Sequence, residues 1–196
     1  MKKMLDNLNN YEIILASGSP RRRELLEGLG LDFKVECLSG IDESYPSDLP
    51  AEETALFIAR KKADAYKSLI KPGQLIITAD TVVVCDNRVL GKPHDKDDAI
   101  RMLEALSRKT HNVITGVAIT AFDKQSSFAV STDVRFAQLS NKEISYYVDK
   151  YKPFDKAGAY GIQEWIGYVG VEYIAGSYYN VMGLPIQRLY QELKKF

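Results

Sequence analysis

The sequence predicts an α/β domain with a mixed β-sheet, and three observations indicate this fold class. Short apolar runs typical of strands alternate with segments in which apolar residues recur at helical spacing. Two long runs with strand character are joined by DKQSS, a segment typical of a hairpin. Another apolar run ends in Ser-Gly-Ser directly before a helix start. We expect residues 1–196 to form a single domain, with residues 1–10 as an N-terminal extension.

The first strand and helix follow from their boundary residues. Residues 11–17 form a short apolar run that predicts a buried strand. Ser19 is a favourable N-cap, and Pro20 fits the first helical position. We therefore expect a helix from about Ser19 to Leu29, with Gly30 as its C-terminal signal.

The next elements lead to a strongly β-like segment. Residues 33–38 predict a second strand, and residues 41–50 predict a loop. Helical spacing predicts a helix over residues 51–70, with apolar positions at Ala55, Ala59, Ala63, Tyr66 and Ile70. Residues 74–85 predict a long strand, and residues 86–91 a turn that returns into a short strand.

Two capped helices flank the predicted hairpin. Asp95 is expected to cap a helix that buries Ala99, Met102, Leu103 and Leu106. Residues 111–122 and 127–139 predict the two strands of the hairpin. Ser140 and Glu143 form a capping box before a helix that buries Ile144, Tyr147 and Val148.

The C-terminal part of the chain gives weaker signals. Residues 152–167 are interrupted by Gly and Pro, and no regular element is assigned to them. Residues 168–176 predict a strand, and residues 176–185 predict a loop or a helical turn. Pro185 is expected to lead a final helix.

Charge and cysteine content restrict the class of protein. Lys plus Arg and Asp plus Glu each number 26, so we do not expect nucleic acid to bind a broad basic surface. Cys37 and Cys85 lie far apart, which argues against a disulfide scaffold and fits a reducing compartment. The sequence shows no apolar leader and no apolar run of membrane-spanning length. We expect a soluble, cytoplasmic protein.

The stretch SGSPRRRELL places three arginines at the positive end of a predicted helix. Backbone N–H groups there and the hydroxyls of Ser17 and Ser19 could bind an anion, and Arg suits phosphate oxygens. Because successive helical residues point about 100° apart, only one or two of Arg21, Arg22 and Arg23 can face such a site. The alternative is a solvated helix face. The pattern GxxxxGK[ST] is absent, so the stretch is not a P-loop.

Asp80 and Thr81 interrupt an otherwise apolar strand in ITADTVVV. A carboxylate in such a run must be paired, bound to a metal, or placed at the end of a strand. Proteins of the α/β class place functional groups at strand ends, which makes Asp80 a candidate functional residue. The alternative is an Asp that forms a turn, although no Gly, Pro or Asn adjoins it.

Three further charged residues are weak signals when taken alone. Lys62 lies at the edge of the alanine stripe of a predicted helix, where its stem could snorkel. Lys92 occupies the rigid turn LGKP, and Glu43 lies in GIDES. A single lysine is usually a surface residue, so none of these positions identifies a site by itself.

The segment KAGAYGIQ, which ends at Gln163, has two interpretations. It is either a close-packed turn or a pocket wall whose Gln amide binds a planar ligand such as a nucleobase. His94 and His111 have no partner at metal-ligand spacing and are interpreted as structural residues. Tyr178 and Tyr179 are either core residues or pocket residues, and the core interpretation is favoured.

Several motifs taken together resemble the Maf family. They are ILASGSPRRRELL, ITADTVVVCDNRVLGKP, HNVITGVAI, KAGAYGIQ and GSYYNVMGLPI, and they span about residues 12 to 190 in order. Members of this family are nucleotide pyrophosphatases that are also associated with the control of septum formation. The resemblance implies the fold shared with inosine triphosphate pyrophosphatases, an elongated mixed sheet flanked by helices with a cleft between two lobes.

The resemblance implies hydrolysis of a nucleoside triphosphate to the monophosphate and pyrophosphate, with a divalent cation, Mg²⁺ or Mn²⁺. Asp80 matches the catalytic carboxylate, described as the proton acceptor, and with Glu43 it would bind the metal. The positions that match phosphate or substrate contacts are Ser17, Arg21, Lys62 and Lys92. The resemblance further implies a homodimer, whereas the net charge and the lack of a long apolar run lead us to expect no stable nucleic-acid partner and no membrane partner.

The resemblance also indicates the substrate. A subgroup that prefers dTTP and UTP carries Arg, Thr and Gln at three discriminating positions, which are Arg22, Thr81 and Gln163 here. Another subgroup, which acts on 7-methyl-GTP, carries Trp, Gln and Glu instead. The implied function is hydrolysis of dTTP and UTP, which would limit incorporation of modified nucleotides and would be linked to cell division arrest.

Two other functions stay open at this point. A broad house-cleaning pyrophosphatase could accept modified nucleotides such as 5-methyl-UTP or pseudo-UTP in the same pocket. A regulator of septum formation could act mainly by binding a partner. The residues also do not separate the roles of Asp80 as base and as metal ligand, because a carboxylate with a pKa near 4 is a weak base at neutral pH.

Overall fold

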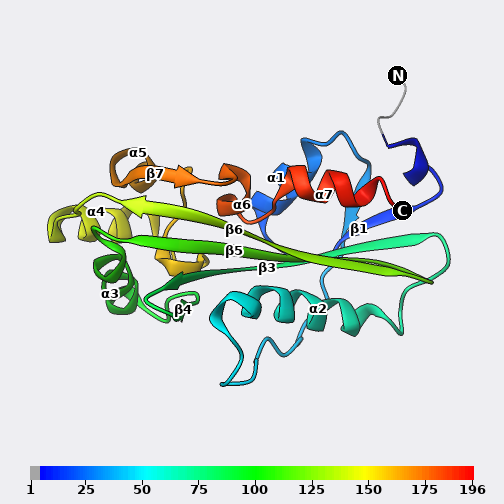
Figure 1. Cartoon of the computed structure of the whole chain (residues 1–196), viewed down its shortest axis with the longest axis horizontal. Helices are drawn as coiled ribbons and strands as arrows, with labels where there is room; N and C mark the ends of the chain where they lie inside the picture. Colours follow the sequence, from blue (N-terminus) through cyan, green and yellow to red (C-terminus); the bar gives the residue numbers. More distant parts are fainter. Residues whose placement is uncertain (1–4) are drawn as a thin grey trace. The chain divides into compact units, whose positions relative to one another are not determined.

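The structure, a computed structural model, describes residues 5–196 (Figure 1). Of the predicted extension, residues 1–4 lie outside the described residues, and the rest contains the 3-10 helix η1, Asp6–Leu8. Contacts divide the chain into two compact units. Unit 1 holds the residues up to Asp80 together with Thr115–Val130 and Gly183–Phe196, and unit 2 holds Thr81–Ile114 and Ser131–Met182. The single domain over residues 1–196 and the cleft stay predictions.

The strands of the described chain form a mixed sheet. They are β1 Glu12–Leu15, β2 Phe33–Val35, β3 Gln74–Cys85, β4 Arg88–Leu90, β5 Thr110–Ala121, β6 Gln125–Phe136 and β7 Val171–Ala175. Their order is β2-β1-β3-β5-β6-β7, and β4 pairs with β3. β1 is parallel to both neighbours, whereas β3 pairs antiparallel with β4, and β6 pairs antiparallel with β7. The predicted α/β class with a mixed sheet is confirmed.

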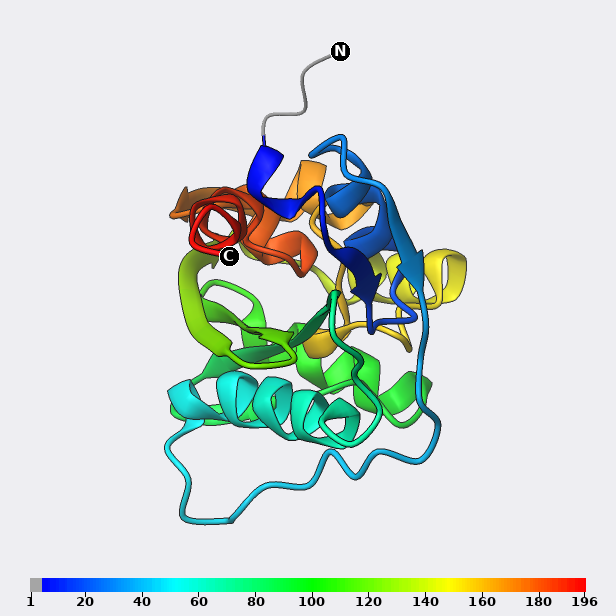
Figure 2. The ribbon, with the colours of Figure 1, turned by 90° about the vertical axis from the view of Figure 1, so that its right-hand side faces the viewer.

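Unit 1 has helices on both faces of its strands. They are α1 Pro20–Glu27, η2 Ala51–Glu53, α2 Thr54–Tyr66 and α7 Ile186–Leu193. Figures 1 and 2 show α2 on one face and α1 and α7 on the other. The core between these layers contains buried strand residues such as Leu15, Leu75 and Ile77, together with Leu26 of α1. Burial of these side chains is the main stabilising contribution in the unit.

α2 lies close to the strands because of two residues that face it. Gly116 on β5 has no side chain, and a Cβ at this position would lie 2.4 Å from the backbone oxygen of Ala55. Thr78 on β3 is fully buried, and its hydroxyl donates to the Ala59 carbonyl at 2.7 Å. These contacts fix the helix against the sheet, which positions the residues that α2 presents to the middle of β3.

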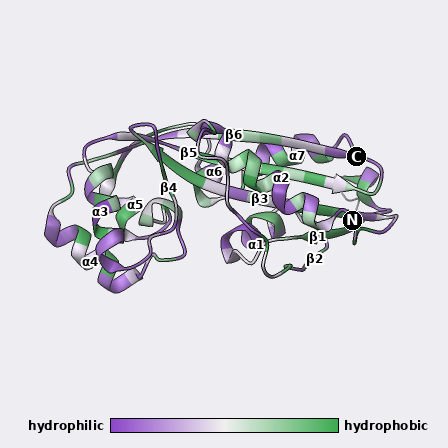
Figure 3. Ribbon diagram, turned by 90° about the horizontal axis from the view of Figure 1, so that it is seen from below, coloured by the Kyte–Doolittle hydropathy of each residue, from purple (hydrophilic) through white to green (hydrophobic). Residues whose placement is uncertain are grey.

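Unit 2 contains the capped helices predicted from the sequence. The helices are α3 Lys96–Leu106, α4 Asn141–Tyr151, η3 Ala157–Ala159, α5 Trp165–Gly170 and α6 Tyr178–Met182. Asp95 caps α3 by accepting from the Asp98 N–H at 2.7 Å, and Ser140 and Glu143 form the predicted capping box of α4. α3 and α4 contact each other, and Figure 3 shows polar and apolar positions mixed along both. Met102 is only half-buried, contrary to the prediction, whereas the other predicted core positions of α3 are buried.

The predicted turns join the strands. Asp86 and Asn87 have φ angles of 50° and 58° between β3 and β4, as the two central residues of a tight hairpin require. β5 and β6 are neighbours in the sheet and are joined by residues 122–124, so the two predicted strands are confirmed, although β6 begins at Gln125 and ends at Phe136 instead of covering residues 127–139.

Some predicted boundaries are wrong by a few residues. α1 ends at Glu27 instead of Leu29, because the Gly28 N–H closes the last turn on Glu24. The predicted strands over residues 33–38 and 168–176 are shorter, since β2 ends at Val35 and β7 begins only after α5. The helix predicted over residues 51–70 is η2 followed by α2, with a turn after it. The unassigned segment contains η3 and the start of α5, and residues 176–185 contain α6, which agrees with the helical turn, one of the two alternatives there.

Two expectations about the whole chain can be compared with the described residues. Within residues 5–196, no helix is both long enough and apolar enough to cross a membrane. Cys37 is exposed and Cys85 is buried, and both are free thiols, in agreement with the prediction that no disulfide scaffold is present.

Candidate active site

The segment between β1 and α1 has the predicted geometry of a capped helix start. The Ser19 hydroxyl accepts from the Arg22 N–H at 3.4 Å, which confirms Ser19 as the N-cap. The buried Ser17 hydroxyl accepts from the Ser19 N–H, also at 3.4 Å. Arg21 is half-buried in the first turn of the helix. Arg23 is exposed and pairs with Glu27 at 2.8 Å, as expected for the solvated member of the triplet.

Arg22 binds the middle of β3 through a fork of hydrogen bonds, since Ala79 and Asp80 lie inside the strand Gln74–Cys85 and not at a strand end as expected. Its Nη1 donates to the Ala79 carbonyl at 2.9 Å and to the Ser17 hydroxyl at 3.2 Å, and its Nε donates to the Gly183 carbonyl at 2.8 Å. Burial lowers the pKa of Arg22, but guanidinium stays charged because its ordinary pKa is far above neutrality. The sequence suggested the charge at this position but not the contacts with backbone carbonyls.

Lys62 of α2 brings two carboxylates of unit 1 together. Its ammonium lies 2.8 Å from Asp80 Oδ1 and 3.0 Å from Glu43 Oε1. The side chains of Lys62 and Asp80 are 14% and 13% exposed, so Lys62 does not snorkel into solvent at the helix edge as expected. This corrected position follows from the anchoring of α2 described above, since Thr78 precedes Asp80 by two positions and lies on the same face of the strand.

The donor set at Asp80 and Glu43 fits a hard divalent cation. Among residues 5–196, no group of three or more His, Cys, Asp and Glu side chains is arranged to hold a metal ion. Mg²⁺ is, however, commonly bound by one or two carboxylates together with substrate phosphates. The carboxylates of Asp80 and Glu43 supply the oxygen ligands that Mg²⁺ prefers, and their two negative charges are balanced by only one ammonium, that of Lys62.

The remaining predicted site residues belong to unit 2. Thr81 directly follows Asp80 on β3 and is half-buried. Lys92 is exposed in the turn after β4. The neighbouring Gly91 carbonyl accepts from the Gly158 N–H at 3.0 Å, which joins the turn of Lys92 to the segment that ends at Gln163.

The segment 156–163 is the close-packed turn that one interpretation predicted. Gly158 and Ala159 have φ angles of 66° and 58°, in the left-handed region. A Cβ on Gly158 would lie 2.8 Å from Val83 Cγ2 of β3. The other interpretation also keeps support, because Gln163 Oε1 is buried and has no hydrogen-bond partner among the described residues. A buried acceptor without a partner is costly, so it marks a position at which a ligand donor would be favourable.

The remaining sequence predictions can be compared with the structure. Tyr178 and Tyr179 are 40% and 50% exposed, so the core interpretation is wrong. These two residues lie on the short helix α6, whose buried positions are instead Asn180 and Met182. His111 is structural as predicted: it is buried, and its Nε2 lies 2.8 Å from the Tyr160 hydroxyl.

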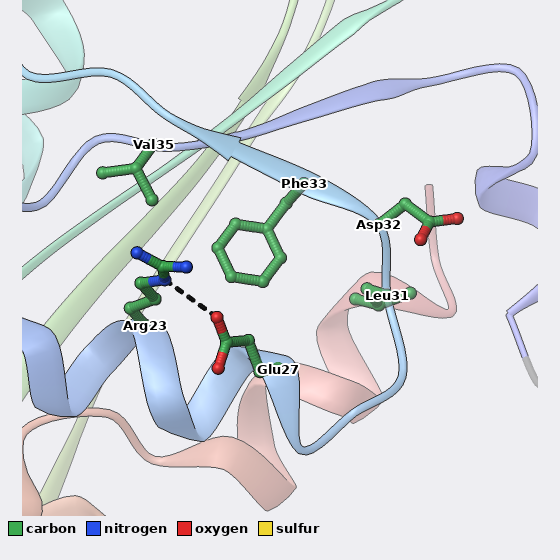
Figure 4. Close-up of a pocket in the computed structure, with 6 residues that line it drawn as sticks. All are labelled: Arg23, Glu27, Leu31, Asp32, Phe33 and Val35. Atoms are coloured by element: carbon green, nitrogen blue, oxygen red, sulfur yellow. Dashed lines mark hydrogen bonds and ion pairs between the residues drawn. The ribbon is translucent and has the colours of Figure 1, made fainter.

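A surface pocket of unit 1 contains none of the predicted site residues. It lies between the end of α1 and β2 (Figure 4) and is lined by Arg23, Glu27, Leu31, Asp32, Phe33 and Val35. The pair formed by Arg23 and Glu27 closes one side of this pocket. The polar contacts assembled around Asp80 are therefore a separate feature of the unit.

Comparisons with known proteins give one family for the chain. A profile of the family described as Maf-like protein matches residues 12–196. A dTTP/UTP pyrophosphatase of Bacteroides thetaiotaomicron is 59% identical over 192 residues, which cover 98% of this chain and 100% of that protein. A dTTP/UTP pyrophosphatase of Phocaeicola vulgatus is 61% identical with the same coverage. The solved structure of a HAM1 protein from Coxiella burnetii has 16% identity and a TM-score of 0.49 over 95% of this chain and all of that one.

Proposed function

This chain belongs to the Maf family, and we propose that it hydrolyses dTTP and UTP to the nucleoside monophosphate and pyrophosphate. Full-length relatives at about 60% identity carry the name dTTP/UTP pyrophosphatase, which supports the reaction and the substrate class. The single observation that carries the proposal is the cluster in which Lys62 bridges Asp80 and Glu43. Next to it, Arg22 binds both Ser17 of the helix start and Ala79, the residue before Asp80.

The proposed phosphate contacts come from residues that supply hydroxyls or cations. Ser17, Arg21 and the positive end of α1 would bind phosphate oxygens, because the helix dipole and a guanidinium both favour anions there. Lys62 and Lys92 would neutralise charge on the phosphate chain. Lys62 is already held at Asp80, so the cation is placed in advance next to the proposed catalytic carboxylate. Placing charge in advance is the largest contribution that a protein usually makes to phosphoryl transfer.

Asp80 and Glu43 would hold the divalent cation, Mg²⁺ or Mn²⁺. A bound divalent cation supplies neutralisation of the phosphate charge. The carboxylate of Asp80 would accept the proton of the attacking water. The carboxylate of Glu43 would add a second negative charge that attracts the cation. We expect chelation with EDTA to reduce hydrolysis at least 100-fold and added Mg²⁺ or Mn²⁺ to restore it. Full activity after exhaustive chelation would exclude this role for the two carboxylates.

Arg22, Thr81 and Gln163 are the proposed specificity residues. Uracil and thymine carry an N3–H donor that cytosine lacks, and the unpartnered Oε1 of Gln163 is a suitable acceptor for it. A base without this donor would leave the buried oxygen unsatisfied, at a cost of about 1–3 kcal/mol. Arg22 would act on the same specificity by fixing the Ala79 carbonyl, and thereby the part of β3 that leads to Thr81.

The proposal is tested by pyrophosphate release from a panel of nucleoside triphosphates. We expect UTP and dTTP to be hydrolysed with kcat/KM at least tenfold above CTP, ATP, GTP and 7-methyl-GTP. A preference for 5-methyl-UTP or pseudo-UTP over UTP would favour the house-cleaning function. No turnover of any triphosphate would favour a regulator that acts by binding. A cytoplasmic location, a homodimer and a link to cell division are further expectations from the sequence.

A further inference from the structure

Unit 2 contains a buried polar network beside Gln163 that the reaction proposed above does not use. The Tyr147 hydroxyl donates to Oε2 of Glu164 and accepts from the Gly161 N–H at 3.0 Å. Lys156 Nζ lies 3.1 Å from Oε1 of the same carboxylate and 2.7 Å from Asp155 Oδ1. Burial and the Glu164 carboxylate raise the pKa of Tyr147, so its hydroxyl keeps its proton and remains a donor.

The network places charged side chains in a largely buried part of unit 2. Tyr147 is fully buried, and the side chains of Lys156 and Glu164 are only 10% and 20% exposed. Removing an ammonium and a carboxylate from water is costly, and apolar residues of similar volume are often at least as stable in such places. Gly161 makes room for the pair, because a Cβ there would lie 3.0 Å from Glu164 Cδ and 3.1 Å from Lys156 Cε. Stability alone therefore gives no reason for these residues.

The network holds the backbone on both sides of Gln163. Gly161, two residues before it, donates its N–H to the Tyr147 hydroxyl, and Glu164, directly after it, accepts from the same hydroxyl. One hydroxyl thus joins both ends of the segment 161–164, whose ends are also linked by the Glu164 N–H and the Gly161 carbonyl at 3.0 Å. The side chain between these anchors is the one whose buried Oε1 has no partner among the described residues.

We propose that Tyr147, Glu164 and Lys156 form a positioning network that sets base specificity by fixing the Gln163 amide at the place of a pyrimidine N3–H donor. The inference rests on the proposed function, because it takes the base of a pyrimidine nucleotide as the ligand of Gln163. Hydrogen bonds weaken steeply with distance and angle, so a loosened segment 161–164 lowers the affinity for uracil. Such loosening has little effect on cytosine, whose N3 carries no proton and is an acceptor, so that Gln163 Oε1 gains no hydrogen bond at that position.

The experiment compares Tyr147→Phe with Tyr146→Phe. Tyr147→Phe removes only the bridging hydroxyl, whereas Tyr146→Phe removes an exposed hydroxyl of the neighbouring residue, which accepts from Lys150 Nζ at 2.8 Å. Calorimetry with α,β-methylene UTP and α,β-methylene CTP measures binding without turnover. We expect Tyr147→Phe to weaken binding of the UTP analogue about tenfold and binding of the CTP analogue less than twofold. In steady state, KM for UTP rises while kcat stays within about threefold, and Tyr146→Phe behaves as wild type.

A second variant keeps the test decisive if Tyr147→Phe does not fold. Glu164→Gln keeps the shape of the side chain but removes the charge that Lys156 and Tyr147 bind, and the same selective loss of the UTP analogue is expected. Unchanged binding of both analogues in a folded variant would overturn the inference. Equal weakening of both analogues, or a fall in kcat alone, would show a merely structural role and overturn it as well. If wild-type protein binds the UTP analogue but releases no pyrophosphate from UTP, the proposed function fails and the inference about binding does not. If wild-type protein binds neither analogue, the proposed function and this inference are both overturned.

Discussion

The arrangement of side chains at the proposed catalytic site depends on one residue, Lys62, through its ammonium group. It lies within 3.0 Å of carboxylates from a loop and from a strand, namely Glu43 and Asp80. In the absence of this cation the two negative charges would repel each other in a partly buried place. The same cation is available to a phosphate chain, so one side chain serves both the folded state and the substrate.

Replacement of Asp80 by Asn is expected to abolish hydrolysis without unfolding the protein. The amide keeps the volume of the side chain but cannot accept the proton of the attacking water, so kcat/KM for UTP should fall at least 100-fold. Asp86→Asn is the matched control, since Asp86 directly follows β3 and forms an exposed pair with Lys109. Near-normal activity of Asp80→Asn in the presence of Mg²⁺ would show that the catalytic carboxylate has been assigned to the wrong residue.

Lys62→Met and Lys61→Met should differ although the residues are adjacent. Lys62 neutralises a carboxylate that is 13% exposed, so its loss should lower the free energy of unfolding by about 2–3 kcal/mol. Lys61 pairs with Asp42 at an exposed position, and its loss should cost less than about 1 kcal/mol. Urea denaturation at neutral pH measures both values. Equal destabilisation by the two variants would mean that the Lys62 pair is effectively solvated.

His111 should make the folded state sensitive to acid. Burial lowers its pKa from 6.5 to about 4 in the folded protein, so between these values the unfolded chain binds more protons. Its contribution to stability is complete above about pH 6.5 and declines as the pH falls to about 4, by about 3 kcal/mol in total. His111→Gln, which does not titrate, should lose less stability between pH 7 and pH 4.5 in urea titrations. Parallel losses in both proteins would refute this assignment.

Elements with a clear boundary signal were the ones that the sequence predicted well. β3 has the predicted bounds, and α4 starts at the predicted capping box because Ser140 and Glu143 satisfy its first N–H groups locally. Residues 168–170 were wrongly predicted as strand. They end the helix α5, in which Gly167 lies against the Ile162 carbonyl so closely that a Cβ would be 1.7 Å away. Such close backbone contacts leave no periodic signal in the sequence.

For the candidate site as well, the sequence indicated individual residues but not the contacts between elements. The sequence indicated Asp80 because a carboxylate interrupts an apolar strand, and it indicated the helix start from Ser19 and its arginines. It predicted Tyr147 only as a core position of α4, since helical spacing reports burial and not the partner of a hydroxyl. The pairing of Lys62 with Asp80 also depends on how α2 packs on β3, which spacing does not describe.

The packing of α2 on β5 gives a prediction at the element scale. Gly116→Ala would place a methyl group 2.4 Å from the Ala55 carbonyl oxygen, a backbone atom that cannot move without shifting the helix. We expect the free energy of unfolding to fall by at least about 2 kcal/mol. Gly91→Ala is the control, because nothing lies within 4 Å of a Cβ at that position. Thermal denaturation that leaves both variants equal to wild type would mean that α2 packs less closely than described.

For the molecule as a whole, one family accounts for the order of motifs along the chain. The match covers residues 12–196, and the relatives align over essentially their entire length. The proposed phosphate and catalytic residues are supplied mostly by unit 1, whereas Thr81, Lys92 and Gln163 belong to unit 2. Asp80 and Thr81 are consecutive, so β3 links the two sets of residues along the chain.

The most direct test of the central claim is the identity of the products formed from UTP. Purified protein with Mg²⁺ should convert UTP into UMP and pyrophosphate in equal amounts, as measured by anion-exchange chromatography before any phosphatase is added. This result would place cleavage between the α- and β-phosphates, as a pyrophosphatase of the Maf family requires. Formation of UDP and inorganic phosphate, or no consumption of UTP, would contradict the account.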